Sequence, residues 1–342
     1  MPKRTLLYYW WILAFALKAV GASWDAAYHF KYLRDFLQLP HLVNGAGDVL
    51  AIFLVIAMAR SGTRGRAFAT IIAGLFIFAF GVIFDQIYHQ IHGIDLTTWS
   101  PSHFTLYLGT LVMLLGVMRQ LAKDASYDAI TPQFCSGALF IFSLFFLDCF
   151  WFPLLQQEQG TITFALIQKG IFTAGPDLRA LITHSAVQIF SDVPEWLYGI
   201  YAGLAMAFSF QFIRAISATK YPATMMAGGY VAARLIMDYI FSANEYPQST
   251  TPYFLVLSAL IFDLASPLFF EKKQSGLSLC VLALFTTIPL ISIALIAADP
   301  PLAPSLPAIA LVLAPAAAAF GILLARFLRP IFFPDDILVL QK

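Results

Sequence analysis

Residues 67–89 read AFATIIAGLFIFAFGVIFDQIYH, an apolar run in which the first charged residue is Asp85. A helix needs about 20 mostly apolar residues to cross a bilayer, so this stretch predicts a membrane-spanning helix. The rest of the chain has the same character. Of its 342 residues, 60% are hydrophobic and 11% are charged, against about 25% charged residues in an ordinary soluble domain. A soluble protein of this size could not bury so much apolar surface, and we expect an integral membrane protein.

Ten such runs predict an all-α, polytopic membrane helical bundle of about ten transmembrane helices. They lie at 5–29, 41–59, 67–89, 103–121, 134–152, 180–213, 222–242, 252–270, 277–298 and 306–328. We expect residues 1–125 to form two helical hairpins, and residues 126–342 to add six more helices to the same membrane domain. The run at 180–213 is too long for one span, and Pro194 is a natural place for a break.

Basic residues orient these helices, because Lys and Arg are enriched in cytoplasmic loops. Clusters that precede the first run or follow an even-numbered run would all lie on one side: Lys3 and Arg4; Arg60, Arg64 and Arg66; Arg119 and Lys123; Arg214 and Lys220; Lys272 and Lys273; Arg326 and Arg329. We therefore expect both termini to be cytoplasmic. The loops at 30–40, 90–102 and 153–179 would lie on the periplasmic, extracellular or lumenal face, with Lys31, Arg34, Lys169 and Arg179 as basic exceptions there.

Charge and cysteine content exclude some classes of function. The net charge of +1 gives no electrostatic case for nucleic-acid binding. The three cysteines, Cys135, Cys149 and Cys280, have no paired spacing, which argues against a disulfide scaffold and against a thiolate metal site.

An internal tandem repeat lies in the first third of the chain. The segment Trp24–His29 (WDAAYH) recurs in the same orientation as Phe84–His89 (FDQIYH). In each copy an Asp is followed four residues later by a His, and a second His stands where the next apolar run begins. The two sets are Asp25, His29 and His41, and Asp85, His89 and His103.

This pattern suits a metal ion. Residues four apart lie on one face of a helix, and the second His enters from the next helix, so two imidazoles and one carboxylate can converge at the outer edge of the membrane. Such ligands suit copper(II), zinc or iron(II). Ionisable residues in membrane helices are costly and usually functional. The alternative is that these residues only anchor the helix ends at the interface.

The spacing resembles that of the C subunit of the copper membrane monooxygenases, the particulate methane and ammonia monooxygenase family. That subunit carries Asp-x3-His-x12-His followed by Asn-x3-His-x13-His. This chain has Asp25-x3-His29-x11-His41, one residue shorter, and Asp85-x3-His89-x13-His103, with Asp in place of Asn. The resemblance covers roughly residues 5–120. It implies a copper-binding membrane protein, an oxygenase of a small apolar molecule, which could work with partner membrane subunits.

Other polar residues near the same face could assist these ligands: Asp35, Asp95, His92, Asn44, Asp48, His184 and Asp192. The repeated pair Asp35 and Asp95 could accept an N–H from a ligating imidazole or could cap a turn. His92 could be an auxiliary ligand or a solvated helix-end residue. His184 and Asp192 could line the same cavity or belong to a polar outer helix. Asp263 lies deep in its run and needs a partner, for which Arg234 is a candidate.

Three functions remain open at this point. The first is a copper-dependent membrane oxygenase or oxidase, or a subunit of one, acting with O2 on a small apolar substrate. The second is an intramembrane zinc hydrolase of a lipid amide or ester, in which zinc lowers the pKa of bound water to about 7. The third is a metal transporter, although ligands gathered at one face do not mark a path across the bilayer. We favour the first, as part of a complex or a homo-oligomer.

Overall fold

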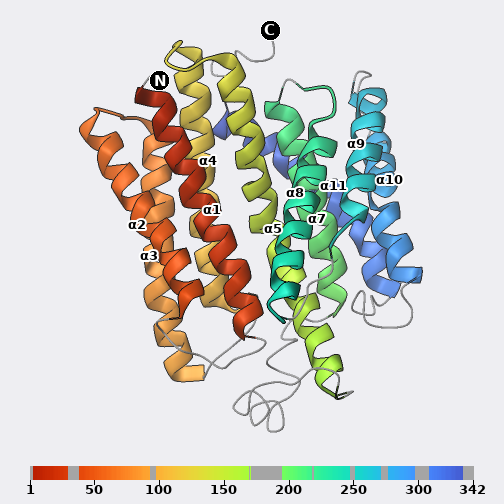
Figure 1. Cartoon of the computed structure of the whole chain (residues 1–342). Coiled ribbons are helices and arrows are strands. Elements are labelled where there is room, and N and C mark those ends of the chain that lie inside the picture. Colours follow the sequence, from red (N-terminus) through yellow and green to blue (C-terminus); the bar gives the residue numbers. More distant parts are fainter. Residues whose placement is uncertain are drawn as a thin grey trace.

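The computed structural model describes residues 3–29, 38–92, 98–168, 170, 195–217, 219–246, 251–270, 276–296 and 308–333. Within these residues every regular element is an α-helix (Figure 1). The helices are α1 (Lys3–His29), α2 (Leu39–Arg60), α3 (Arg66–His92), α4 (Pro101–Ser126), α5 (Pro132–Gln168), α7 (Glu195–Ile216), α8 (Pro222–Ala243), α9 (Phe254–Phe270), α10 (Gly276–Ile296) and α11 (Ala308–Phe332).

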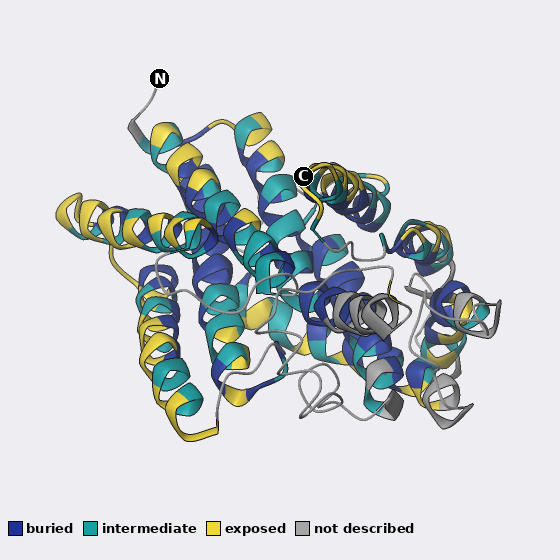
Figure 2. Ribbon diagram, turned by 60° about the horizontal axis from the view of Figure 1, so that its bottom comes forward, coloured by how far each residue is buried: buried dark blue, intermediate teal, exposed yellow. Residues whose placement is uncertain are grey.

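Seven of these helices, α1 to α5, α7 and α11, contain stretches long and apolar enough to cross a membrane. The expectation of an all-α chain is confirmed for the described residues, and these seven helices are consistent with a multi-pass membrane protein. Shorter apolar stretches lie at Phe254–Pro267 and Ser278–Ser292. Large apolar side chains such as Phe53, Phe76 and Ile83 are exposed. Exposed positions lie along the outer sides of the helices (Figure 2). In a bilayer these side chains would face lipid.

The first four helices form two antiparallel hairpins, α1 with α2 and α3 with α4, on one side of the bundle (Figure 1). Contacts within each hairpin are extensive, whereas α2 and α3 touch little. α5 lies between these hairpins and the remaining helices, and it packs against α1, α4, α7 and α8.

Glycines let the helices of the first hairpin meet backbone to backbone. A Cβ on Gly21 would lie 2.5 Å from the backbone nitrogen of Asn44, and one on Gly47 would lie 2.7 Å from the carbonyl oxygen of Ala14. Small residues at such contacts are typical of membrane helix pairs, which gain stability from close packing.

The second hairpin closes in the same way. A Cβ on Gly81 would lie 2.8 Å from the side chain of Leu106, and one on Gly109 would lie 2.4 Å from the backbone nitrogen of Phe78. Gly21 and Gly81 each stand four residues before the Asp of a triad. Because the tight contact is one turn away, it fixes the height of that Asp relative to the next helix.

One end of the bundle is basic, and we define this basic end by Arg4, Arg64, Lys123, Arg214 and Arg329. Arg4 at the start of α1 donates hydrogen bonds to Thr63 Oγ1 (3.2 Å), in the turn after α2, and to Asp124 Oδ2 (3.4 Å), near the end of α4. The end of α1 and the start of α2 therefore lie at the opposite end, as do the end of α3 and the start of α4 (Figure 1).

The last described helix ends at this basic end too. α7 and α11 run parallel, because Gly203 abuts Ala314 near their starts and the rings of Phe212 and Phe333 meet at 5.7 Å near their ends. The start of α1 and the end of α11 therefore lie on the same side of the bundle (Figure 1).

One expectation from the sequence was wrong, and a neighbouring one falls outside the described residues. Residues 153–168 form no loop, because α5 continues through Pro153 to Gln168. A proline within a membrane helix is tolerated where neighbouring helices satisfy the freed backbone groups. Residues 171–194, with the expected break at Pro194, lie outside the described residues.

The prediction that Arg234 is the partner of Asp263 was also wrong. Its Oδ2 accepts hydrogen bonds from the backbone nitrogen (2.8 Å) and hydroxyl (2.9 Å) of Thr224, and Arg214 Nη1 lies 3.6 Å from its Oδ1. Arg234 instead donates to Ser23 Oγ at 2.8 Å. The reason is distance along α8: Arg234 stands ten residues after Thr224, about 15 Å at the helical rise.

Candidate metal centres

The first triad converges where α1 ends and α2 begins. Asp25 and His29 stand on the last two turns of α1, and His41 is the third residue of α2. The Nε2 atoms of His29 and His41 lie 3.3 Å and 2.7 Å from Asp25 Oδ1, and they lie 3.4 Å from each other. Three donor atoms on two helices thus surround one point.

The second triad repeats this arrangement on α3 and α4. Asp85 and His89 stand near the end of α3, and His103 is the third residue of α4. The Nε2 atoms of His103 and His89 lie 3.3 Å and 3.6 Å from Asp85 Oδ1. The Ser102 hydroxyl donates a hydrogen bond to the same oxygen at 2.8 Å. Both triads lie at the end of the bundle opposite the basic end.

These distances fit a bound cation. In a tetrahedral site, metal–ligand bonds of about 2.0–2.2 Å place the donor atoms about 3.3–3.6 Å apart. The contacts of 3.3–3.6 Å in the two triads match this spacing. The 2.7 Å contact between His41 and Asp25 is shorter and would open as an ion entered. Each Asp/His/His group could therefore hold a metal ion.

Hydrogen bonding in the first triad supports the same interpretation. Asp25 Oδ1 is buried, and no hydrogen bond of good geometry reaches it from the described part of the chain. The Nε2 atoms of His29 and His41 lie close to this oxygen without the alignment that a hydrogen bond needs. This oxygen therefore has two imidazole nitrogens within 3.3 Å and is placed to share a cation with them.

Local sequence explains why the second His of each triad stands at the start of its helix. Pro40 is the second residue of α2, and Pro101 is the first residue of α4. In the first turn of a helix the backbone N–H has no partner within the helix, so a proline costs little there. In α4 the cap is complete, because Ser100 Oγ accepts a hydrogen bond from the His103 backbone nitrogen at 3.4 Å. The N-cap of α2, Gln38, makes no such bond.

The auxiliary residues divide into three groups. Asp35, Asp95, His184 and Asp192 lie outside the described residues. His92 is exposed, its ring lies 4.5 Å from that of Tyr88, and it belongs to neither triad.

Asp48 belongs to neither triad and has a partner of its own. Asn44 packs its backbone against Gly21. Asp48 forms an ion pair with Lys18, a buried residue of α1 whose Nζ also lies 3.4 Å from the centre of the Phe78 ring. The pairing of Lys18 with Asp48 was not predicted from the sequence, although a lysine inside an apolar run indicates a buried partner.

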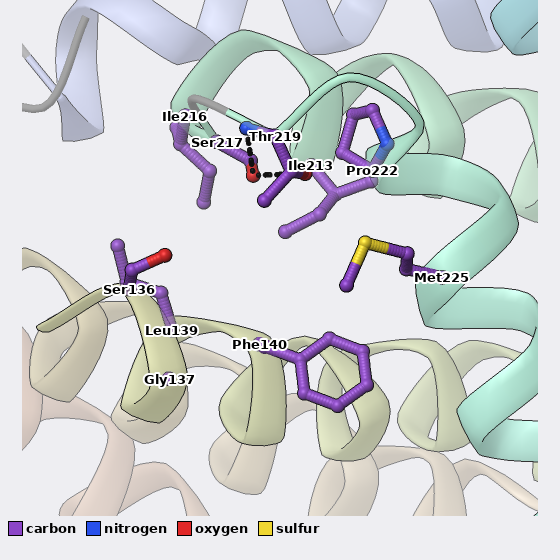
Figure 3. A pocket seen from close by; sticks show the side chains of 10 residues that line it. All are labelled: Ser136, Gly137, Leu139, Phe140, Ile213, Ile216, Ser217, Thr219, Pro222 and Met225. Carbon is purple, nitrogen blue, oxygen red and sulfur yellow. Dashed lines mark hydrogen bonds between the residues drawn. The ribbon is translucent and has the colours of Figure 1, made fainter. Parts of the chain in front are cut away.

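A pocket elsewhere in the bundle has a different character. It holds about 170 Å³ of space at the basic end, between the start of α5 and the turn that joins α7 to α8 (Figure 3). Its walls include Phe140, Ile213 and Met225, and the hydroxyls of Ser217 and Thr219 bond to each other. No ionisable side chain lines it. The metal-ligating chemistry in the described residues therefore belongs to the triads.

No protein-family model, curated protein or solved structure matches this chain. The two triads are therefore the feature of this chain that points to a function.

Proposed function

We propose that this chain is a membrane metalloprotein built on two copies of one helical hairpin, each of which binds one cation. The observation that carries the proposal is the match between the triads: the same residue types converge in the same order, from the end of one helix and the start of the next. Gly21 and Gly81 support the duplication, since each closes its hairpin one turn before the Asp.

Copper is the metal that we propose. Two imidazoles and one carboxylate suit copper(II), and the spacing of the triads resembles the C subunit of the copper membrane monooxygenases. Zinc and iron(II) accept the same ligands, so the identity of the metal is a matter for direct measurement.

The proposed activity is the oxygenation or oxidation of a small apolar molecule. Copper in these sites would supply one-electron chemistry with O2. The chain's own part is to hold the ion with three side chains, which leaves coordination positions open, and to place both sites at the end of apolar helices. A small apolar substrate could then arrive through the bilayer. Further membrane subunits or a second copy of the chain could complete the enzyme.

The membrane orientation is part of the same proposal. The basic end faces the cytoplasm by the positive-inside rule, so both termini are cytoplasmic. The triads then lie at the periplasmic, extracellular or lumenal face.

Metal analysis of the detergent-purified chain tests this function. We expect copper in the protein as isolated, a copper(II) electron paramagnetic resonance signal, and O2 consumption in the presence of a reductant and a short alkane. His29→Ala and His89→Ala should each remove part of the copper, and His92→Ala, a histidine outside both triads, should remove none. Zinc alone without O2 consumption would favour the lipid hydrolase, and the absence of any metal would overturn the proposal.

Metal transport is the second candidate, because ionisable groups continue down α1 from the first triad. Lys18, paired with Asp48, stands seven residues before Asp25, and Arg4, paired with Asp124, stands fourteen before Lys18. Residues seven apart share a helix face, and this face spans about 30 Å. Uptake of radiolabelled copper into vesicles, lost in a Lys18→Met/Asp48→Leu double variant that keeps its metal sites, would decide for transport.

A further inference from the structure

A chain of hydroxyl groups links two ligands of the second site. The backbone N–H of His103 donates to Ser100 Oγ at 3.4 Å, the hydroxyls of Ser100 and Ser102 lie 3.2 Å apart, and Ser102 Oγ donates to Asp85 Oδ1 at 2.8 Å. Because the Ser102 proton points to the carboxylate, Ser100 is the donor to Ser102. The chain therefore ties the start of α4 to the end of α3 across the site.

The final acceptor is the oxygen that faces the imidazoles. Asp85 Oδ1 lies within 3.6 Å of the Nε2 atoms of His89 and His103. A carboxylate oxygen has two lone-pair positions, so the Ser102 hydroxyl occupies one and leaves the other for a cation. Ser102 is fully buried, so water does not compete for this bond. The hydroxyl thereby holds the carboxylate in the orientation that a metal ion needs.

The first site lacks this device. The residues that match Ser100 and Ser102, counted back from the second His, are Gln38 and Pro40. Gln38 makes no side-chain cap, and proline has no hydroxyl. Asp25 Oδ1 receives no well-aligned hydrogen bond from any residue that the structure describes. The two sites thus share ligands and differ in what holds the carboxylate.

We infer that Ser102 is a positioning residue that sets the metal affinity of the second site and makes the two sites unequal. This inference rests on the proposed metal-binding function. Residues that orient a ligand in this way typically contribute about 10–100-fold to metal affinity. The effect should be confined to the second site, because Ser102 bonds to Asp85 and none of the described residues has the same role beside Asp25.

Titration of Zn²⁺ into the purified full-length chain, against a chelating dye, tests the inference. In a His41→Ala background, which isolates the second triad, Ser102→Ala should raise the dissociation constant for zinc about 10–100-fold. Ser102→Thr keeps the hydroxyl and should bind zinc nearly as the parent does. Thr105→Ala is the matched control, because it removes a hydroxyl from the next turn of α4 that donates to the Pro101 carbonyl at 2.7 Å.

The first site serves as the internal check on folding. In a His103→Ala background, which isolates the first triad, adding Ser102→Ala should leave the zinc affinity of the first site unchanged. If the alanine variant does not fold, the retained affinity of Ser102→Thr supports the inference and its loss opposes it. If the His41→Ala protein binds no zinc at all, the proposed metal function fails. If it binds zinc and Ser102→Ala leaves the dissociation constant unchanged, the role of Ser102 alone is overturned.

Discussion

Lys18 and Phe78 stand at matched positions of the two hairpins, each seven residues before the Asp of its triad, and they touch. The Lys18 Nζ lies 3.4 Å from the centre of the Phe78 ring and also pairs with Asp48. A cation–π contact of this kind gains strength where water is excluded. It joins the two hairpins near their middle, where α2 and α3 themselves touch little.

Lys18→Met should therefore destabilise the chain strongly. It leaves Asp48 without its cation inside an apolar helix, and removing one partner of a buried ion pair typically costs about 3–5 kcal/mol. Lys18→Met/Asp48→Leu should recover most of this loss, since both charges are gone. Thermal unfolding in detergent would measure both variants. Equal melting temperatures for Lys18→Met and the parent would show that the pair contributes nothing to stability.

Gly47→Ala should separate the helices of the first hairpin. Its new methyl group would lie 2.7 Å from the carbonyl oxygen of Ala14, and overpacking of this kind costs about 1–3 kcal/mol. Gly45→Ala, on the same helix, meets nothing within 4 Å and should be neutral or slightly stabilising, because alanine favours helix over glycine. Zinc titration and thermal unfolding of the two variants provide the comparison. Equal behaviour would exclude a packing role for Gly47.

Metal binding at both sites should weaken as the pH falls. Imidazole binds a metal only when neutral, so protons compete with the ion as the pH falls. Zinc affinity should therefore decrease from about pH 8 to about pH 5, with up to two protons taken up for each ion released. Zinc affinity measured at a series of pH values gives the slope. A flat profile over this range would mean that histidine does not ligate the metal.

The metal ligands could be found in the sequence because their spacing is local. Asp25 and His29 are one helical turn apart, and His41 follows after a short loop, so helix geometry alone brings them together. Gly21 and Gly81 also repeat in the sequence, four residues before each Asp. Their role in close helix packing could not be predicted, because it depends on which helix lies opposite. The all-helical membrane architecture was likewise predictable, since hydropathy requires no knowledge of packing.

Contacts between distant segments could not be predicted. Asp48 was expected near the first triad, and its pairing with Lys18 depends on how α1 and α2 align. Arg214, and not Arg234, proved to be the cation beside Asp263, because the relative heights of α7, α8 and α9 decide that contact. The extension of α5 past Pro153 could not be predicted for another reason. Proline usually ends a helix in a soluble protein, whereas in a membrane bundle neighbouring helices can satisfy the backbone groups that a proline leaves without a partner.

The number of metal ions bound per purified chain is the sharpest test of the proposal that each triad binds one cation. Saturation with zinc, followed by removal of free ion and mass spectrometry of the metal content, should give two ions in the parent chain and in His92→Ala. It should give one ion each in His29→Ala and His89→Ala, and none in the double variant His29→Ala/His89→Ala. A double variant that retains two ions would contradict the account, because the cations would then be bound elsewhere.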